Sequence, residues 1–402
     1  MTAITLTGLC LISATLAAGP AASTEAESAI PGPGLAVLSD NTASQSGYIQ
    51  FSQTVPAPGT PLTCAVSSAT GATGGDAISV AANAADAHAA IQQAINQASA
   101  AGGGTVALPA GTHTIDAPLI LKSDVRLQGA GADTIIKAGA NFLATPGPHG
   151  GSPLITTDGA NNVSLVNFTA DQSGDVLDGN SINRLNEYLI DIRFSTNVIV
   201  DRVHTRNPFT YSIVAADSTK FCIRGSSTQI STSGKYDQLD GIHILNSSFG
   251  DVIGNTVDQQ SGGQDGDDGL VAHPFNGEVH DIAYIGNTVR GGVHGAGMQL
   301  AYTAAGDRIY NLTIQNNEFK QSPEGIHTGT YGEAGSSDNI VIGGAPGKGN
   351  IFHNNNGDAV TFEGALSNIT VTHNTACKSG QFIVVGGTNT VNRDNTIDDS
   401  QC

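Results

Sequence analysis

Residues 240–244 read DGIHI, and the pattern returns as DGLVA at 268–272, AGMQL at 296–300 and EGIHT at 324–328. The repeated glycines stand at positions 241, 269, 297 and 325, so they are evenly spaced along the chain. GDAVTF adds a glycine at 357, after a slightly longer step. A repeat of this length with three short strands forms one coil of a parallel β-helix, because each coil buries its apolar side only against a stacked neighbour. The sequence therefore predicts an all-β fold, a right-handed parallel β-helix built as a single solenoid.

A second series of strand-like segments lies between these repeats, and several of them run into Asn-Thr or Asn-Asn. Stacked coils lie about 4.8 Å apart, so residues in register form ladders. We therefore predict an internal ladder of asparagine amides. A ladder or turn role is also preferred for the asparagines of four glycosylation sequons, Asn162, Asn246, Asn311 and Asn368. The expected strands are Val163–Phe168, Val198–Val203, Asp251–Val257, Ile282–Val289, Leu312–Phe319, Ile340–Ile342 and Ile369–Val371.

The N-terminal residues differ from the repeats in composition. Residues 1–23 hold an apolar run from Ile4 to Ala18 and then small residues, which indicates a signal peptide and a secreted, extracellular protein. No Lys or Arg precedes the run, which departs from the usual pattern of a signal peptide. The run is shorter than the roughly 20 residues of a membrane-spanning helix, so a membrane anchor is disfavoured. Residues 24–75, rich in Ser, Thr, Ala, Gly and Pro, are expected to form a linker or loosely packed N-terminal cap. Residues 76–402 are expected to form the catalytic β-helix domain.

The composition narrows the possible partners. The chain of 402 residues has a formal charge of −19, with 16 basic and 35 acidic residues. Nucleic acid binding needs cations that replace counterions around phosphates, so this charge argues against it. A long polyanionic glycan is disfavoured for the same reason, and a neutral substrate is favoured.

The cysteines fit an exported protein. After removal of Cys10 with the signal peptide, Cys64, Cys222, Cys377 and Cys402 remain, an even number that suits two disulfides. Cys377 and Cys402 are placed to tie down the C-terminal end. The sequence leaves the pairing open, and free buried thiols are an alternative.

A helix is expected before the first coil. Residues 84–101 carry an apolar stripe made of Ala90, Ile91, Ala94, Ile95 and Ala98, and three glycines end it before a strand at Thr105–Leu108. Residues 90–136 resemble the opening of the pectate-lyase-superfamily β-helix proteins, in which a capping helix precedes a Gly-rich turn and the first coils. This resemblance supports the fold and leaves the chemistry open, because the same opening occurs on lyases, hydrolases, epimerases and phage tailspikes.

The exact repeat allows the residues of each ladder to be written out. The residues before successive glycines are Asp240, Asp268, Ala296 and Glu324, and those two places after are His243, Val271, Gln299 and His327. Asp240, Asp267 and Asp268 therefore converge on adjacent coils, and we expect His273, His294, His243, His327 and Glu324 near them. Like charges this close do not all ionise easily, so at least one carboxyl keeps its proton near neutral pH. Glycosidic cleavage needs this division between one protonated acid and one carboxylate.

Two structural explanations compete with a catalytic role. SGGQDGDDG at 261–269 also suits an acidic turn, since Asp favours turns on its own account. Clustered carboxylates also suit calcium, a hard cation, although no metal or other cofactor is predicted. Asp240, one coil earlier in the same column as Asp268, favours the catalytic interpretation.

The segments LDGIHI, DGDDGLVA, GVHGAGMQL and EGIHTGT, between 239 and 330, resemble the polygalacturonase-type glycoside hydrolases. That family carries Asn-Thr-Asp-Gly, Asp-Asp, Gly-His-Gly and Arg-Ile-Lys on successive coils. The resemblance implies that Asp267 is the proton donor and that Asp240 and Asp268 hold the water that attacks the anomeric carbon with inversion. It also implies that His294 orients or tunes the acid.

Departures from that pattern point to another substrate. The Arg-Ile-Lys positions read His327, Thr328 and Gly329, so the cations that would grip a galacturonate carboxylate are missing. This favours a neutral glycan, as in the related β-helix dextranases. Residues expected to contact the polysaccharide or oligosaccharide substrate are His243, His273, Gln299, Glu324, His327 and Tyr302. With no Trp in the chain, sugar platforms are limited to tyrosines such as Tyr236, Tyr302 and Tyr331.

Two other functions remain open at this point. A polysaccharide lyase or C5-epimerase acting on a uronate-containing glycan needs a base and positive charge or calcium, and Lys and Arg are sparse near the aspartates. A non-enzymatic, glycan-binding or adhesive β-helix explains the repeats and leaves the clustered aspartates unexplained.

Overall fold

The computed structural model describes residues 35–39, 47–51, 64, 77–82, 84–177, 188–230, 238–261 and 266–401. The chain divides into two compact units, residues 1–57 and residues 58–402. In the first unit, β1 (Leu35–Ser39) and β2 (Gly47–Phe51) pair antiparallel. This pair was not predicted within the expected linker or cap, and the predicted signal peptide lies outside the described residues. Within the described residues, none of the helices has the length and apolar character needed to span a bilayer.

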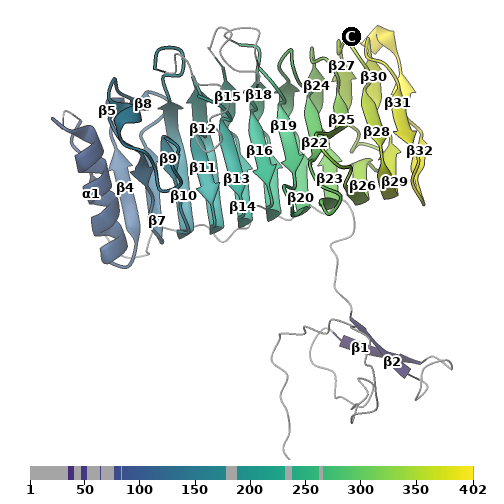
Figure 1. The fold of residues 1–402 in the computed structure, drawn as a ribbon, viewed down its shortest axis with the longest axis horizontal. Coiled ribbons are helices and arrows are strands. Elements are labelled where there is room, and N and C mark those ends of the chain that lie inside the picture. Colours follow the sequence, from purple (N-terminus) through teal and green to yellow (C-terminus); the bar gives the residue numbers. More distant parts are fainter. Residues whose placement is uncertain are drawn as a thin grey trace, which may run out of the picture. The chain divides into compact units, whose positions relative to one another are not determined.

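The second unit is a right-handed parallel β-helix, as the sequence predicts. Figure 1 shows its strands stacked side by side from α1 to the C-terminal end. A complete coil carries three strands, for example β16, β17 and β18, before the next coil begins at β19. One sheet takes one strand from each coil. Its ten parallel strands are β6 (Leu119–Ile120), β9 (Ile155–Thr156), β11 (Ile190–Arg193), β13 (Ile213–Ala216), β16 (Ile242–Leu245), β19 (Leu270–His273), β22 (Met298–Tyr302), β25 (Ile326–Thr330), β28 (Val360–Glu363) and β31 (Phe382–Val385).

The other strands of each coil form a second, continuous parallel set. The long strands β10 and β12 pair with two shorter strands of a neighbouring coil and so link the two remaining faces. The members are β3 (Ile78–Ser79), β4 (Gly104–Leu108), β5 (Gly111–Ile115), β7 (Val125–Gly129), β8 (Thr134–Ala138), β10 (Asn161–Asp171), β12 (Thr196–Arg206), β14 (Thr219–Arg224), β15 (Ser227–Gln229), β17 (Ser248–Ile253), β18 (Thr256–Asp258), β20 (Glu278–Ile285), β21 (Thr288–Arg290), β23 (Arg308–Gln315), β24 (Glu318–Lys320), β26 (Ser336–Gly343), β27 (Ile351–His353), β29 (Ala365–Thr372), β30 (Thr375–Cys377), β32 (Val391–Arg393) and β33 (Thr396–Ile397).

The predicted helix is α1 (Ala87–Ala100), and the side chain of Asp86 caps its first turn. Its buried residues, Ile91, Ala94, Ile95 and Ala98, are four of the five in the predicted stripe. Gln92 exchanges two hydrogen bonds of 2.9 Å with the backbone of Ile120, which holds the helix on the first coils. Two short 3₁₀ helices, η2 (Phe142–Ala144) and η3 (Asp399–Gln401), complete the described elements.

An asparagine ladder runs through the coils, as predicted. The Oδ1 of Asn287 accepts from the backbone N–H and the side-chain amide of Asn255, at 2.9 and 3.0 Å. Asn287 and Asn317 repeat the arrangement on the next coil, and the buried column continues through Asn350 and Asn374 to Asn395. Each amide thereby pairs with backbone N–H and C=O groups where the chain turns between two strands. These backbone groups would be costly to bury unpaired.

These corners also correct the predicted strand boundaries. The expected continuous segments Asp251–Val257, Ile282–Val289 and Leu312–Phe319 are each two strands, β17 and β18, β20 and β21, and β23 and β24. Gly254, Gly286 and Asn316 have φ values of 62°, 65° and 55° and turn the chain just before a ladder asparagine. Apolar residues continue on both sides of the corner because both strands face the same core, so the break is hidden in the pattern.

The sequon asparagines occupy left-handed backbone positions. Asn246 follows β16, whereas Asn162, Asn311 and Asn368 lie within β10, β23 and β29. Asn162, Asn246, Asn311 and Asn368 all have φ between 45° and 56°, the left-handed region that asparagine tolerates better than most residues. Each side-chain amide donates to an aspartate of the preceding coil, at 2.7–3.3 Å. These bonds between coils agree with the ladder role, one of the two roles expected for these asparagines.

The repeated glycines are needed because neighbouring coils approach closely. A Cβ at Gly241 would lie 2.4 Å from the carbonyl oxygen of Gly269, and one at Gly297 would lie 2.7 Å from that of Gly325. The predicted continuation of the column at Gly357 is wrong. Ala359 accepts the hydrogen bond from Ile326 and stands in register with Gly325, because this coil is longer than the spacing of the glycines indicates.

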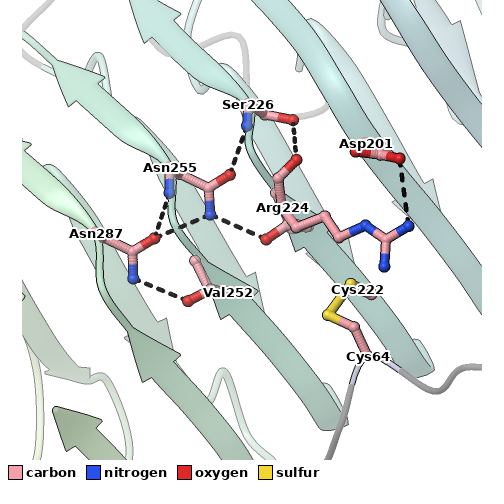
Figure 2. Close-up of a disulfide and its surroundings, with 9 residues drawn as sticks. Cys64, Asp201, Cys222, Arg224, Ser226, Val252, Asn255 and Asn287 are labelled. Carbon is pink, nitrogen blue, oxygen red and sulfur yellow. Dashed lines mark hydrogen bonds and ion pairs between the residues drawn. A yellow bond between two sulfur atoms is a disulfide. The ribbon is translucent and has the colours of Figure 1, made fainter. Parts of the chain in front are cut away.

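One disulfide joins Cys64 to Cys222 on β14, with the Cα atoms 5.8 Å apart. Figure 2 shows it beside the ladder residues Asn255 and Asn287. Cys377 is also disulfide-bonded, and its predicted partner, Cys402, lies outside the described residues.

Replacement of Asn317 by Ala tests the ladder. The side chain is 1% exposed and bonds to the backbone carbonyl of Tyr284 and to Asn287 and Asn350. Its loss leaves buried donors and acceptors unpaired, so we expect the free energy of unfolding in urea to fall by about 2–4 kcal/mol. Asn356→Ala, at an exposed position, is the control and should cost less than about 0.5 kcal/mol. Equal effects of the two changes would contradict the ladder's structural role.

Candidate functional site

Coil stacking places two of the predicted aspartates directly above one another. The N–H of Gly241 donates to the carbonyl of Asp268, and the N–H of Gly269 donates to that of Ala296, both at 2.9 Å. The residue before each repeated glycine therefore stands in one column at the entrance of the ten-stranded sheet. In chain order this column, which we call the acid column, contains Tyr211, Asp240, Asp268, Ala296, Glu324 and Asp358.

Asp267, next to the acid column, completes a cluster of three carboxyl groups. One carboxylate oxygen from each of Asp240, Asp267 and Asp268 lies within 4.8 Å of the others. Asp240 and Asp268 are each 3% exposed, whereas Asp267 is partly exposed. The structure thus brings the three residues together as the repeat predicts, with Asp267 as the accessible member.

Backbone and side-chain donors hold the two buried carboxyl groups. The Oδ1 of Asp240 accepts from the N–H of Asp268 at 3.2 Å, and the Oδ1 of Asp268 accepts from the N–H of Ala296 at 2.6 Å. The Oδ2 of Asp240 lies 2.6 Å from the Nδ1 of His243. Each carboxyl is therefore fixed by the coil that follows it.

Burial sets the protonation of this cluster. Loss of solvent raises the pKa of Asp240 to about 8. It also raises the pKa of Asp268 well above its ordinary value, with further increases from the charges of Asp267 and Asp240. Removing a carboxylate from water disfavours its charged form, and close carboxylates repel one another. The expectation that protons remain on this cluster near neutral pH agrees with both shifts.

His243 does not line the surface as predicted. It points outward from the sheet, yet it is 2% exposed, because the ring of Tyr211 on the preceding coil stacks on it at 4.4 Å and 9°. Its Nε2 lies 3.2 Å from the Nδ1 of His273, and burial lowers the pKa of both imidazoles to about 3. The predicted role of His243 in substrate contact is therefore wrong, since its side chain is buried between Tyr211 and Asp240.

A second polar group surrounds the accessible side of Asp268. His327 places its Nε2 4.0 Å from the Oδ1 of Asp268 and its Nδ1 3.7 Å from the Oε2 of Glu324. Gln299 is 4% exposed and donates to the hydroxyl of Tyr331 at 2.7 Å, with its amide nitrogen also 3.0 Å from the Nε2 of His327. His327 and Glu324 are half-buried and remain candidates for sugar contacts, whereas Gln299 supports them from beneath.

Two other predicted site residues, His294 and Tyr302, lie in different surroundings. His294 lies in the loop between β21 and β22 with an exposed side chain, and its N–H donates to the carbonyl of Gly266, next to Asp267. Tyr302 belongs to the hydrophobic core, is 3% exposed and shares a hydrogen bond with Ser337. Its predicted role as a sugar platform is wrong, because it falls on the inward-facing side of β22. Tyr236 lies outside the described residues.

The three carboxyl groups are close enough to share one ion but supply only part of a calcium shell. Calcium takes six to eight oxygen ligands at about 2.3–2.6 Å. Both oxygens of Asp240 and one of Asp268 are already engaged by the backbone or by His243. The remaining oxygens of the cluster supply only part of such a shell.

Two arginines of neighbouring coils pair with carboxylates other than the three clustered aspartates. Arg290, on β21, pairs with Asp258, and Arg308, on β23, pairs with Glu278, both in the second set of strands. Among the ion pairs of the described residues, Asp240 and Asp268 have histidine partners, His243 and His327.

The sequence profile of one known family covers the aspartate cluster. The rhamnogalacturonase A/epimerase, pectate lyase-like family matches residues 76–287, more than half of the chain. The chain belongs to this family. The matched range includes Asp240, Asp267 and Asp268 and ends before Gln299, Glu324 and His327, so the family match does not extend over the polar group around Asp268. No curated protein sequence matches the chain significantly.

Solved structures similar to this family member share its fold. The exopolygalacturonase of Thermotoga maritima is 15% identical, with a TM-score of 0.59, over 82% of this chain and 93% of that chain. The polygalacturonase of Erwinia carotovora ssp. carotovora is 16% identical, with a TM-score of 0.57, over 82% and 95%. A mutant tailspike protein of E. coli bacteriophage HK620 is 18% identical, with a TM-score of 0.57, over 75% and 55%. At these identities the likeness establishes the β-helix fold alone.

Two tyrosines at the site are missed or undervalued by sequence reasoning. Tyr211 heads the acid column, but YSIVA at 211–215 lacks the repeated glycine, and the step from Ile213 to its partner Ile242 departs from the regular spacing, so the glycine pattern does not reveal it. Aligning apolar pairs instead of glycines would reveal it. Tyr331 is considered above only as an isolated platform, and its side chain is 66% exposed and bonded to Gln299.

The pH dependence of stability tests the buried state of Asp240. Because folding raises the pKa of Asp240, the neutral buried carboxyl costs no free energy of unfolding below the unfolded pKa of about 4. The free energy of unfolding then falls as pH rises from there through the folded pKa of about 8. Asp240→Asn cannot ionise, so we expect this variant to exceed the wild type by a few kcal/mol in free energy of unfolding at pH 9 and to match it at pH 4. Thermal melts across this pH range measure the difference.

Asp133→Asn, at an exposed position outside the site, is the control and should follow the wild type at every pH. Parallel pH curves for Asp240→Asn and the wild type would show that Asp240 ionises normally.

Proposed function

We propose that this chain is a secreted glycoside hydrolase that cleaves a neutral polysaccharide. The observation that carries the proposal is the convergence of three carboxyl groups from adjacent coils, two of them buried with raised pKa values and one accessible. A purely structural arrangement would gain nothing from burying Asp240 and Asp268 together, since each raises the cost of ionising the other. The names of the family and of the polygalacturonase neighbours support action on a polysaccharide.

The proposal assigns different tasks to the three aspartates. Asp267, the accessible member, donates its proton to the glycosidic oxygen as the bond to the leaving sugar breaks. Asp240 and Asp268 hold the attacking water in the state in which one of the two has lost its proton. The oxygen of this water attacks the anomeric carbon, and its proton passes to the ionised member of the pair. Such a site needs one proton donor and one carboxylate in the same turnover. His294, in the loop beside Asp267, orients or tunes the donor.

The stereochemical course of the reaction belongs to the same proposal. Inversion is implied by the likeness to polygalacturonase-type enzymes, yet carboxyl groups of inverting enzymes are usually about 6.5–9.5 Å apart and those of retaining enzymes about 5–5.5 Å. The nearest oxygens here lie within 4.8 Å of one another. Proton NMR of the first product anomer therefore distinguishes the two courses directly.

A neutral substrate is supported by the residues around Asp268. His327, Thr328 and Gly329 take the positions of the cationic tripeptide, and burial lowers the pKa of His327 to about 4, so it is uncharged at neutral pH. Glu324 lies 3.7 Å from His327 and would repel a uronate carboxylate. Secretion is supported by the Cys64–Cys222 disulfide, because disulfides persist in oxidising compartments.

Asp267→Asn tests the assignment of the acid. An amide cannot donate the proton that the leaving sugar needs, so we expect kcat to fall by at least about 1,000-fold on the true substrate, with the thermal midpoint little changed. Reducing-end release from a panel of neutral and acidic polysaccharides measures activity, and Asp133→Asn serves as the matched control.

Four other outcomes would change the proposal. Near-normal activity of Asp267→Asn would remove this residue from the chemistry. Unsaturated, ultraviolet-absorbing products would establish a lyase, and a changed uronate epimer without cleavage would establish an epimerase. Tight binding to one glycan with no product from any would establish a binding protein.

A further inference from the structure

A chain of three titratable side chains leads away from the proposed water-activating pair. The Oδ2 of Asp240 lies 2.6 Å from the Nδ1 of His243, and the Nε2 of His243 lies 3.2 Å from the Nδ1 of His273. The far nitrogen, Nε2 of His273, is buried and has no hydrogen-bond partner among the described residues. Two imidazoles thus follow a carboxyl group in series. His243 uses both of its ring nitrogens, and His273 uses Nδ1 and leaves Nε2 available.

This series has two complete hydrogen-bonded states. In the first, the Asp240 carboxyl donates to Nδ1 of His243, whose Nε2–H donates to Nδ1 of His273, which carries its own proton on Nε2. In the second, Nδ1–H of His273 donates to Nε2 of His243, whose Nδ1–H donates to the Asp240 carboxylate. Both states keep both imidazoles neutral, and they differ by one proton, which enters or leaves at Nε2 of His273.

We propose that Asp240, His243 and His273 form a proton relay that resets the carboxyl group after each turnover. This inference rests on the proposed function only for the source of the proton, the attacking water. The proton on Asp240 passes to Nδ1 of His243, the Nε2 proton of His243 passes to Nδ1 of His273, and the Nε2 proton of His273 leaves to a water molecule. His243 and His273 are positioning residues in this scheme, since neither needs to touch the sugar.

The surroundings favour neutral rings throughout this transfer. Burial lowers the pKa of His243 and of His273 to about 3, with a further decrease for His273 from His243 and an increase from Asp307. Other titratable groups that face the series are Asp267, Asp268 and Tyr211. An imidazolium is therefore costly at either ring, and concerted exchange between tautomers avoids forming one.

Packing holds the two rings in place for the exchange. Tyr211 stacks on His243, and the rings of His243 and His273 are tilted by 59° with centroids 5.3 Å apart. Phe275 meets His273 edge-on, with centroids 6.1 Å apart. These contacts leave Nε2 of His273 as the end of the series, where a water molecule must accept or supply the proton.

Nitrogen NMR of the full chain labelled with ¹⁵N-histidine tests the relay without any substrate. We expect His243 and His273 to carry Nε2–H at low pH and Nδ1–H at high pH, switching together with one midpoint near the Asp240 pKa of about 8. Asp240→Asn should abolish this switch and leave one tautomer at every pH. Separate titration of either ring to imidazolium, or a switch that survives in Asp240→Asn, would overturn the relay even if no glycan is ever cleaved.

Activity provides a second test once a substrate is found. His273→Asn keeps a polar atom near the position of Nδ1 and has no second tautomer, so we expect kcat to fall at least tenfold with KM within twofold of the wild-type value. Added imidazole should restore part of the rate in His273→Ala. His280→Gln, at a half-buried position in the second set of strands, is the control and should leave kcat unchanged.

The outcomes separate the relay from the proposed function. A wild-type kcat in His273→Asn would overturn the relay and leave the hydrolase proposal standing. The same conclusion would follow if activity fell only because KM rose, and if imidazole did not rescue His273→Ala. Normal tautomer switching together with the absence of any glycan cleavage would support the relay and overturn the hydrolase proposal.

Discussion

The hydrogen bonds between successive coils fix which residues of distant coils become neighbours. The backbone bonds from Gly241 to Asp268 and from Gly269 to Ala296 each join positions that are far apart in the sequence and one coil apart in space. A slip of one residue would turn every side chain to the other face of its sheet, so register decides both the core and the site. The asparagine ladder and the repeated glycines help to fix this register. The asparagines do so through side-chain hydrogen bonds between coils, and the glycines by allowing the backbones of neighbouring coils to approach closely.

The site uses this register at some cost to stability. Asp240 and Asp268 are buried together, and each has a raised pKa, mainly from loss of solvent. Backbone N–H groups partly offset the cost, because they stabilise the charged form that burial disfavours. The surrounding stack of apolar coils supplies the stability that the buried aspartates do not.

Much of the fold could be predicted from the sequence because a solenoid repeats the same physical requirement in every coil. The glycine spacing, the helical stripe of 90–98 and the asparagine pairs each follow from one local rule, and the structure agrees with them. The convergence of Asp240 with Asp268 could be predicted by counting residues from one repeated glycine to the next. Their neighbour Asp267 followed from adjacency alone.

The failures have a common cause in contacts that no local pattern encodes. The burial of His243 depends on Tyr211, which lies in a coil without the repeated glycine, and the inward direction of Tyr302 depends on where β22 begins. The register of Ala359 depends on the length of one turn. The partner of Cys64 is 158 residues away, a separation that only the stacked coils reduce to bonding distance.

That cross-link has a topological consequence. The covalent ring closed by Cys64 and Cys222 contains α1 and every strand from β3 to β13. A protease that cut one peptide bond inside this ring would leave a single molecule under oxidising conditions, because the sulfurs still join the fragments. The N-terminal part of the solenoid would then dissociate only after reduction, so a nick in its loops would be silent on a non-reducing gel.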